Sequence, residues 1–369
     1  MAFGAPRGVT PRGDTSTVRL VTLAKASVLD GKLQLVELLG RGSFGDVWGV
    51  IRLSDRKRFA AKILRSELIE QDEIVRRFDR ERRCGSLVRS KYVAPVHEAV
   101  TAGPGPLYLV TDWYRGETLL ARLAREKYLS FGEAAPIVED LLLGVDAVHK
   151  AGVIHRDLKP ANVFLARRRG GLLRAVVLDF GVAKVLGEGD LPKEMLTAKG
   201  ATLGSLSFMA PEQVNGSSDA DVRADLYAIG VIVYRMLTGV LPHAPTTAAE
   251  LLAMKLDRDA PTLGSATGDR WPARLEAFTA ALLHRSREAR TPSAQIAIQE
   301  LRALRSLYPA IDMAQSSETE SDELESAPTE TGALFIPAAR RSRLLAPTPT
   351  PPSGTGLHAD ATESEGGSG

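Results

Sequence analysis

The hydrophobic pattern of the chain changes near residue 112, from short strand-like segments to longer helix-like ones. In the first part apolar and polar residues alternate between glycines and charged turns, which is typical of a strand meander. These strand-like segments are Leu33–Leu39, Asp46–Arg52 and Arg58–Leu64. In the later part apolar residues recur at helical spacing. The helix-like segments include Ala134–Lys150, Arg223–Leu237 and Ala273–Leu283. The pattern predicts an α+β fold with a small β-rich lobe followed by a larger α-rich lobe.

We expect the folded unit to cover residues 28–308. Residues 1–27 are rich in Gly, Pro, Thr and Arg, so we expect a flexible extension there, although Val18–Ala26 could pack onto the domain as a short strand or helix. Residues 309–369 contain too few apolar residues to offset the entropy of ordering. We therefore expect a disordered tail, in which the basic and apolar segment Phe335–Leu345 is the one candidate for docking or autoinhibition.

Charge and cysteine content indicate the cellular compartment of the protein and the kinds of partner that it can bind. With 47 Lys and Arg against 45 Asp and Glu, the net charge of +2 gives no overall attraction to nucleic acid or to an anionic membrane. The single cysteine, Cys84, cannot form an internal disulfide, and the N-terminus lacks the basic and apolar blocks of a signal peptide. The most apolar run, Ala224–Val240, is interrupted by Asp225 and Arg235 and is no membrane span. We expect a cytoplasmic protein without a nucleic acid partner.

A glycine-rich motif, Gly40-Arg41-Gly42-Ser43-Phe44-Gly45-Asp46-Val47, lies between two strand-like segments. Its glycines would let backbone N–H groups close over phosphates without a Cβ in the way. A Rossmann turn needs a helix directly after the third glycine, but residues 47–51 are strand-like, and a P-loop needs Gly-Lys-Ser/Thr. For this motif alone, an ordinary glycine-rich hairpin is an equal alternative.

The next motif places a cation, Lys62, within the apolar strand Ala60–Leu64. A buried cation is costly unless an anion lies nearby. Glu81 is the candidate partner, in a charged amphipathic helix that the sequence predicts over Ser66–Val88. The alternative is that Lys62 reaches the surface and that Glu81 is one more solvated charge.

The densest polar cluster lies in Val153–Phe164, between apolar flanks. It holds Asp157, Lys159 and Asn162 within six positions. A carboxylate that accepts a hydroxyl proton, a cation for a phosphoryl oxygen and an amide for Mg²⁺ are the groups that phosphoryl transfer requires. A structural loop of the same composition is the alternative.

Two further motifs follow along the chain. Val176–Gly181 is an apolar strand that ends in Asp179, Phe180 and Gly181, and it would deliver a carboxylate to a metal at the end of a buried strand. Taken alone, an ordinary strand and turn is the simpler explanation. The segment Met209-Ala210-Pro211-Glu212 comes next, after a loop rich in Gly, Thr and Ser.

Together and in this order, the motifs resemble those of the eukaryotic-type protein kinase family, and most of all its serine/threonine branch as found in bacteria. The resemblance covers about residues 33–306. It implies a two-lobed kinase fold: an N-lobe over about 28–112 with one regulatory helix, a hinge over about 112–117, and a helical C-lobe over about 118–308. It also implies transfer of the γ-phosphoryl group of ATP to protein Ser or Thr hydroxyls, with Mg²⁺ or alternatively Mn²⁺ as the metal.

The resemblance assigns a role to each motif. Lys62 would hold the α- and β-phosphates and Glu81 would orient Lys62. Asp157 would accept or orient the proton of the substrate hydroxyl, and Lys159 would stabilise charge on the γ-phosphoryl group. The expected metal ligands are Asn162 and Asp179. The positions expected to contact ATP are Leu39, Gly40, Arg41, Gly42, Ser43, Phe44, Gly45, Val47, Ala60, Lys62, Thr111, Asp112 and Trp113.

Further positions match the family by the same resemblance. A lysine two positions after Asp157, here Lys159, is typical of the catalytic loop of serine/threonine kinases. Thr111 occupies the gatekeeper position beside the adenine-binding hinge. Glu212 and Arg290 match a buried ion pair of the large lobe. Asp225 matches the residue that holds the backbone of the catalytic loop.

The resemblance also implies regulation through the activation loop, which would be Asp179–Glu212 in this chain. Arg156 corresponds to an arginine that binds a phosphorylated residue of that loop. We expect Thr197 or Thr202 to carry the phosphate, after autophosphorylation in trans within a possible homodimer. The alternative is a loop that is held by packing alone.

Three features depart from the usual family pattern. Ser205 and Phe208 stand where Thr and Tyr are usual. Ser205 keeps a hydroxyl that would touch Asp157 and Lys159, so we expect a substrate-cleft residue with a shifted preference next to the acceptor. The basic turn Arg167–Gly171 lengthens the connection between Asn162 and Asp179. This turn is either structural or a docking patch.

Two other function classes stay open. A pseudokinase scaffold would bind partners without catalysis, but it usually lacks Lys62, Asp157 or Asp179, and all three are present. A small-molecule phosphotransferase of related fold ordinarily lacks the Ala-Pro-Glu segment and the long activation loop present here. We therefore expect protein substrates with Ser or Thr acceptors.

Overall fold

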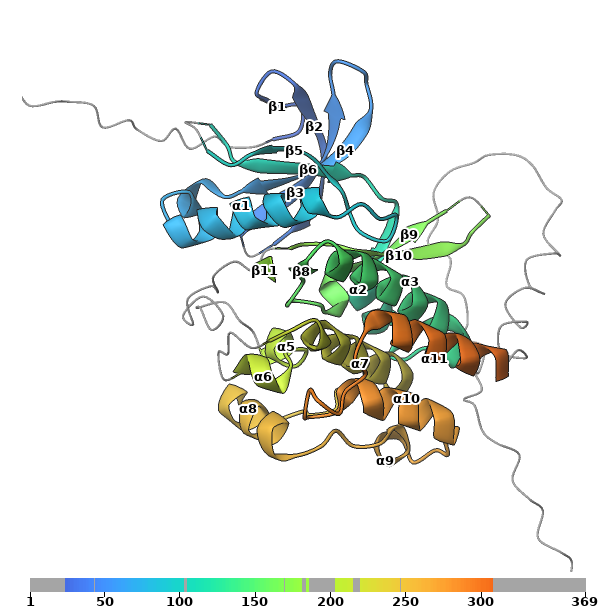
Figure 1. Cartoon of the computed structure of the whole chain (residues 1–369). Coiled ribbons are helices and arrows are strands. Elements are labelled where there is room, and N and C mark those ends of the chain that lie inside the picture. Colours follow the sequence, from blue (N-terminus) through green and yellow to red (C-terminus); the bar gives the residue numbers. More distant parts are fainter. Residues whose placement is uncertain are drawn as a thin grey trace, which may run out of the picture.

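The computed structural model describes residues 24–42, 44–102, 105–168, 170–180, 184–185, 203–214, 220–245 and 247–307. These residues form a smaller lobe of strands with helix α1 and a larger lobe of helices (Figure 1). The two-lobed α+β architecture predicted from the hydrophobic pattern is therefore confirmed. The expected N-terminal extension, except its last residues, and the expected tail lie outside the described residues.

The smaller lobe is built on one six-stranded antiparallel sheet of order β1-β2-β3-β4-β6-β5. Its strands are β1 (Val28–Leu29), β2 (Leu33–Arg41), β3 (Gly45–Arg52), β4 (Arg58–Leu64), β5 (Val96–Val100) and β6 (Tyr108–Asp112). The three strand-like segments of the sequence correspond to β2, β3 and β4. The centre of β4 is buried because the sheet and α1 cover it, and this burial sets the environment of Lys62.

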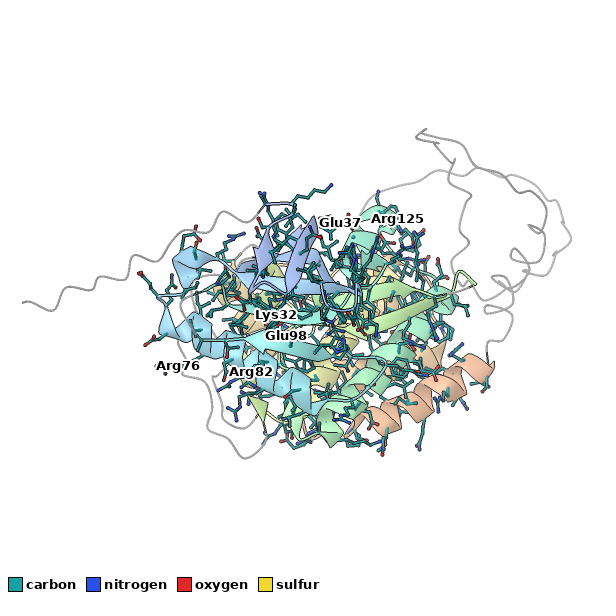
Figure 2. All side chains as sticks on the ribbon, turned by 90° about the horizontal axis from the view of Figure 1, so that it is seen from above. Lys32, Glu37, Arg76, Arg82, Glu98 and Arg125 are labelled. Atoms are coloured by element: carbon teal, nitrogen blue, oxygen red, sulfur yellow. The ribbon has the colours of Figure 1, made fainter. Side chains whose placement is uncertain are left out.

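The sheet curls so that its two ends approach each other. The ammonium of Lys32, between β1 and β2, lies 3.7 Å from the carboxylate of Glu98 in β5, and Figure 2 labels both side chains. The hydroxyl of Tyr108 in β6 donates to the Asp30 carboxylate over 2.9 Å. The first and last strands of the sheet are thus tied together by side chains.

The helix predicted over Ser66–Val88 is interrupted. The structure has a 3₁₀ turn η1 (Ser66–Leu68) and then α1 (Asp72–Leu87). Leu68 and Ile69 pack against the same buried apolar cluster as the sheet-facing side of α1, and Gln71 takes an extended conformation before α1 begins. The chain therefore turns inward between the two helices, which the charge pattern did not reveal.

The larger lobe is centred on two long helices, α3 (Phe131–Lys150) and α7 (Arg223–Thr238). α3 begins at a capping box of Ser130 and Glu133, and α7 ends at Gly239, whose φ of 81° suits a helix C-terminus. The other helices are α2 (Leu119–Glu126), α5 (Leu203–Leu206), α6 (Pro211–Val214), α8 (Ala248–Asp257), α9 (Leu263–Thr267), α10 (Ala273–Leu283) and α11 (Ala294–Leu307). They enclose the largest apolar core of the molecule.

Short strands lie beside the upper end of α3 (Figure 1). The loop with Asp157, Lys159 and Asn162 connects two of them, β8 and β9. They are β7 (Gly116–Thr118), β8 (Val153–Ile154), β9 (Val163–Arg167), β10 (Leu173–Val177) and β11 (Lys184–Val185), with the 3₁₀ turn η2 (Pro160–Asn162). β9 and β10 form an antiparallel hairpin, so the basic turn joins two neighbouring strands. Of the described helices, none is both long enough and apolar enough to cross a membrane.

Candidate active site

The glycine-rich motif forms the tight turn between β2 and β3. The N–H of Gly42 donates to the carbonyl of Gly45 over 2.8 Å, and the Arg65 guanidinium donates to the Gly42 carbonyl over 2.9 Å. A Cβ on Gly45 would lie 2.2 Å from the carbonyl oxygen of Ile63, so glycine alone fits beside β4. Ser43 lies outside the described residues. The turn thus closes against the strand that carries Lys62.

Lys62 is held by two carboxylates from distant parts of the chain. Its Nζ lies 2.7 Å from Glu81 Oε2, which confirms the predicted pair, and 2.9 Å from Asp179 Oδ2. Burial alone would lower the pKa of Lys62, but the carboxylates of Asp179 and Glu81 outweigh it and raise that pKa. Burial, with help from the Asp179 carboxylate, raises the pKa of Glu81 to about 7. The site thus keeps Lys62 as a cation.

The polar cluster in Val153–Phe164, which the resemblance predicts to be the catalytic loop, is internally bonded. Lys159 Nζ lies 2.8 Å from Asp157 Oδ2, and the Asn162 amide donates to the same oxygen over 3.0 Å and to the Asp157 carbonyl over 2.8 Å. Lys159 Nζ also lies 3.4 Å from Ser205 Oγ. Asp157, Lys159 and Asn162 are therefore neighbours, and Ser205, the expected substrate-cleft residue, lies beside Lys159.

Asp225 of α7 anchors the start of this loop. Its carboxylate accepts from the backbone N–H of His155 over 2.9 Å and of Arg156 over 2.8 Å. The ring of His149 lies 2.8 Å from the same carboxylate. Burial opposes ionisation, but the hydrogen bond and the charge of His149 keep the pKa of Asp225 below its ordinary value.

Backbone strain accompanies this anchor. The backbone φ angle is 63° at Arg156 and 58° at Asp179. Both lie in the left-handed region, which residues other than glycine rarely adopt. The ring of His155 packs on Phe180 at 5.0 Å between centroids, and its Nε2 lies 3.0 Å from the Leu178 carbonyl. These contacts fix the backbone on both sides of the Asp157 and Asp179 carboxylates.

The residues present fit a nucleotide and a divalent metal. Asn162 and Asp179 offer oxygen ligands, and Mg²⁺ in nucleotide sites uses one or two carboxylates together with phosphate oxygens. Among the described residues, no cluster of three or more His, Cys, Asp or Glu side chains suits a metal by itself. In the described region, Oγ1 of Thr111 is buried without a hydrogen-bond partner, beside Ala60 on the neighbouring strand.

Comparison with known proteins agrees with this geometry. A sequence model of the protein kinase domain matches residues 33–301. The chain belongs to the protein kinase family. It is 36% identical over 230 residues to serine/threonine-protein kinase pkn3 of Myxococcus xanthus, a match that covers 62% of this chain and 42% of that protein. It is 32% identical over 280 residues to serine/threonine-protein kinase PkaB of Streptomyces coelicolor, covering 74% of this chain and 63% of that protein.

Solved structures agree on the fold. The Mycobacterium tuberculosis PknI kinase domain superimposes with a TM-score of 0.57 and 25% identity, over 76% of this chain and 99% of that one. Among the curated relatives, the chain spans 42% of pkn3, 32% of Myxococcus xanthus Pkn1 and 63% of PkaB. Protein kinases use ATP with a divalent metal and act on proteins.

The segment predicted as the hinge follows β6. The Trp113 ring covers Gly49 of β3 so closely that a Cβ on Gly49 would lie 2.8 Å from it, and the Arg58 guanidinium lies 5.4 Å from the ring centroid. The carboxylate of Asp112 lies 2.7 Å from the His97 ring. The expected contacts of Leu39, Thr111, Asp112 and Trp113 with ATP stay predictions.

The buried ion pair that the resemblance suggested is present in this chain. Arg290 donates through Nη1 to Glu212 Oε1 over 2.7 Å and through Nη2 to Oε2 over 3.0 Å. Among the regulatory positions, Arg156 is buried and its Nη2 lies 3.5 Å from the Ala220 carbonyl. Thr197 and Thr202 lie outside the described residues.

Sequence reasoning missed the anchoring role of His149. It lies in the last turn of α3, 76 positions before Asp225, and only its place at the end of an apolar helix distinguishes it in the sequence. It also missed the contact of Asp179 with Lys62, since 117 positions separate them.

Proposed function

We propose that this chain is a serine/threonine protein kinase that transfers the γ-phosphoryl group of ATP to Ser and Thr hydroxyls of proteins. One observation carries the proposal: Lys62, held by Glu81 and Asp179, and the bonded group of Asp157, Lys159 and Asn162 meet where the two lobes join. The cation, the base and the metal ligands of phosphoryl transfer are thus all present.

Each side chain has a part that follows from its surroundings. Glu81 holds the Lys62 ammonium in place, so that it can bind phosphate oxygens. Asp157 accepts or orients the proton of the substrate hydroxyl, and Lys159 beside it offsets negative charge on the transferred group. When bound, metal-ATP supplies the phosphoryl group and further positive charge. Asn162 and Asp179 would hold that metal.

The finer assignments belong to the same proposal. We take the metal to be Mg²⁺, with Mn²⁺ as a substitute, because oxygen ligands suit both. We take residues 28–308 as the catalytic domain, with the N-lobe over about 28–112, the hinge over about 112–117 and the C-lobe over about 118–308. The near-neutral net charge and the single cysteine support a cytoplasmic domain without a nucleic acid partner.

A transfer assay tests the proposal. The purified chain is incubated with γ-labelled ATP, Mg²⁺ and a generic basic protein, beside its Asp157→Asn form, and phosphorylated positions are mapped by mass spectrometry. We expect label on Ser and Thr of protein with the wild-type chain alone. Binding of ATP without any transfer indicates a pseudokinase, and label on small molecules alone indicates another phosphotransferase.

Regulation by the activation loop is part of the proposal. A phosphate on Thr197 or Thr202 brings about −1.5 to −2 charges, enough to pair with Arg156 and order the loop. Autophosphorylation in trans, within a transient homodimer, is the simplest source. Replacing both threonines by Ala should lower the rate of peptide phosphorylation well below wild type, and an unchanged rate would remove this part of the proposal.

A further inference from the structure

Lys255 of α8 is a buried lysine outside the catalytic group. Its side chain is among the most completely buried in the described chain, with a relative exposure of 1%. Its Nζ donates to the backbone carbonyls of Ser207 over 2.8 Å and Met209 over 2.7 Å. The hydroxyl of Tyr227 in α7 lies 3.4 Å away, and the Tyr227 ring centroid 4.8 Å away.

This arrangement needs a reason, because a buried lysine is costly. Burial lowers the pKa of Lys255 to about 7, and the nearby Arg290 shifts it in the same direction while Glu212 opposes the shift. An apolar residue of similar length would fill the space without that cost. What lysine adds is two hydrogen bonds to the backbone of one short segment.

That segment, Ser205–Met209, leads away from the catalytic loop. At its start, Ser205 Oγ lies 3.4 Å from Lys159 Nζ. Directly after its end, the N–H of Ala210 donates to Gln213 Oε1 over 3.0 Å, and the Gln213 amide lies 3.3 Å from the Arg156 carbonyl. Ser205 thus contacts the catalytic loop directly, and the residue after Met209 is linked to that loop through Gln213.

Lys255 bonds to the part between those ends. The carbonyls of Ser207 and Met209 flank Phe208, which is half-buried against the core of the large lobe. Fixing both carbonyls fixes the direction of the backbone on either side of Phe208. We expect substrate residues that flank the acceptor hydroxyl to pass this surface, because it begins at Ser205, which lies next to the Lys159 that contacts Asp157.

We propose that Lys255 is a positioning residue that holds Ser205–Met209 in the shape that binds the residues next to the acceptor Ser or Thr of a protein substrate. The inference rests on the proposed kinase function and deepens it. The hydrogen bonds of Lys255 go to Ser207, Met209 and Tyr227 rather than to the Lys62 group or Asp157. Its loss should therefore weaken binding of protein substrate and leave binding of ATP unchanged.

The test compares Lys255→Met, which keeps the length of the side chain and removes its donors, with a control of similar local cost. In the control, Thr279→Val, a buried hydroxyl of α10 loses its 2.9 Å bond to the Leu275 carbonyl, away from the segment. The substrate is a synthetic basic peptide with one Ser that the wild-type chain phosphorylates. KM for peptide, KM for ATP and ATP hydrolysis without peptide are measured.

We expect KM for peptide to rise roughly tenfold in Lys255→Met, the effect of about one lost hydrogen bond. KM for ATP and ATP hydrolysis should stay within about twofold of wild type, and Thr279→Val should change none of the three. An unchanged KM for peptide, or the same change in Thr279→Val, overturns the inference.

A second measurement does not depend on activity. Lys255→Gln keeps an NH2 donor group on a shorter side chain and serves where Lys255→Met fails to fold by circular dichroism. Hydrogen exchange of the backbone amides of residues 205–210 should be faster in Lys255→Gln than in wild type, with α10 unaffected. Unchanged exchange in that segment overturns the positioning role. A folded wild-type chain that transfers no phosphate removes the proposed function instead, and the exchange result still decides the role of Lys255.

Discussion

The pair of Glu212 and Arg290 allows a quantitative prediction. The Arg290 side chain has no exposed surface and the Glu212 side chain has 13%. Besides the two bonds to Glu212, Arg290 donates to the backbone carbonyls of His284, Arg223 and Arg285, over 3.0, 2.8 and 3.3 Å. In Glu212→Gln the guanidinium keeps these carbonyls and loses the carboxylate with which it is paired among the described residues.

The cost follows from leaving a buried charge without its partner. Removing one partner of a buried ion pair typically costs about 3–5 kcal/mol, and glutamine, which keeps one acceptor, places the loss near the lower end. About 3 kcal/mol is a large fraction of the roughly 5–15 kcal/mol by which proteins are stable. For a domain of this size it corresponds to a fall in Tm of roughly 6–12 °C.

Thermal unfolding followed by circular dichroism checks this value. The control is Asp146→Asn, which breaks the ion pair with Lys150, whose side chain is 62% exposed, and should cost less than about 1 kcal/mol. Adding Arg290→Met to Glu212→Gln should restore part of the stability, because no uncompensated cation remains. A Tm of Glu212→Gln within about 2 °C of wild type would refute the argument.

Three further predictions concern other parts of the chain. Lys62→Met and Asp179→Asn should each lower the rate of phosphoryl transfer by roughly 100-fold or more with the fold intact by circular dichroism, and a variant that keeps a tenth of the activity would contradict the assigned role. Truncation after Ala310 should leave Tm and peptide phosphorylation nearly unchanged, whereas a marked change in activity would indicate a regulatory tail. Because burial lowers the pKa of Lys255 to about 7, the folded protein binds fewer protons than the unfolded chain above that pH. Urea unfolding should therefore show wild type gaining stability relative to Lys255→Met as pH rises from about 7 toward 10, by at most about 1.4 kcal/mol per pH unit, and parallel curves would contradict the lowered pKa.

The parts that the sequence predicted are those whose signal is local. β2, β3 and β4 follow from alternating apolar residues, and the pairing of Lys62 with Glu81 follows from a cation in an apolar strand near a charged helix. The order of the motifs then suggested the family. The break between η1 and α1 was not predicted, because the apolar contacts of Leu68 and Ile69 are not evident from the pattern of a charged segment.

The parts that could not be predicted depend on contacts between distant residues. His149 and Lys255 look like ordinary polar residues of amphipathic helices until α7 and Ser207–Met209 fold against them, 76 and 48 positions away. A lysine within a helix is most often solvated, so its burial is a property of the tertiary structure alone. Local patterns and the family resemblance therefore indicated Glu81, Asp225 and Arg290 as supporting groups, but not His149 or Lys255.

The curl of the small-lobe sheet affects whether two copies of this protein can pair through the edges of their sheets. An open sheet edge can add a strand from another molecule, and natural proteins prevent this with very short edge strands and charged side chains. Here one edge strand, β1, has two residues, and the Lys32 and Glu98 charges lie where the first strands approach β5 (Figure 2). When two copies of this chain meet, the short β1 edge and these charges disfavour pairing of one sheet with the other.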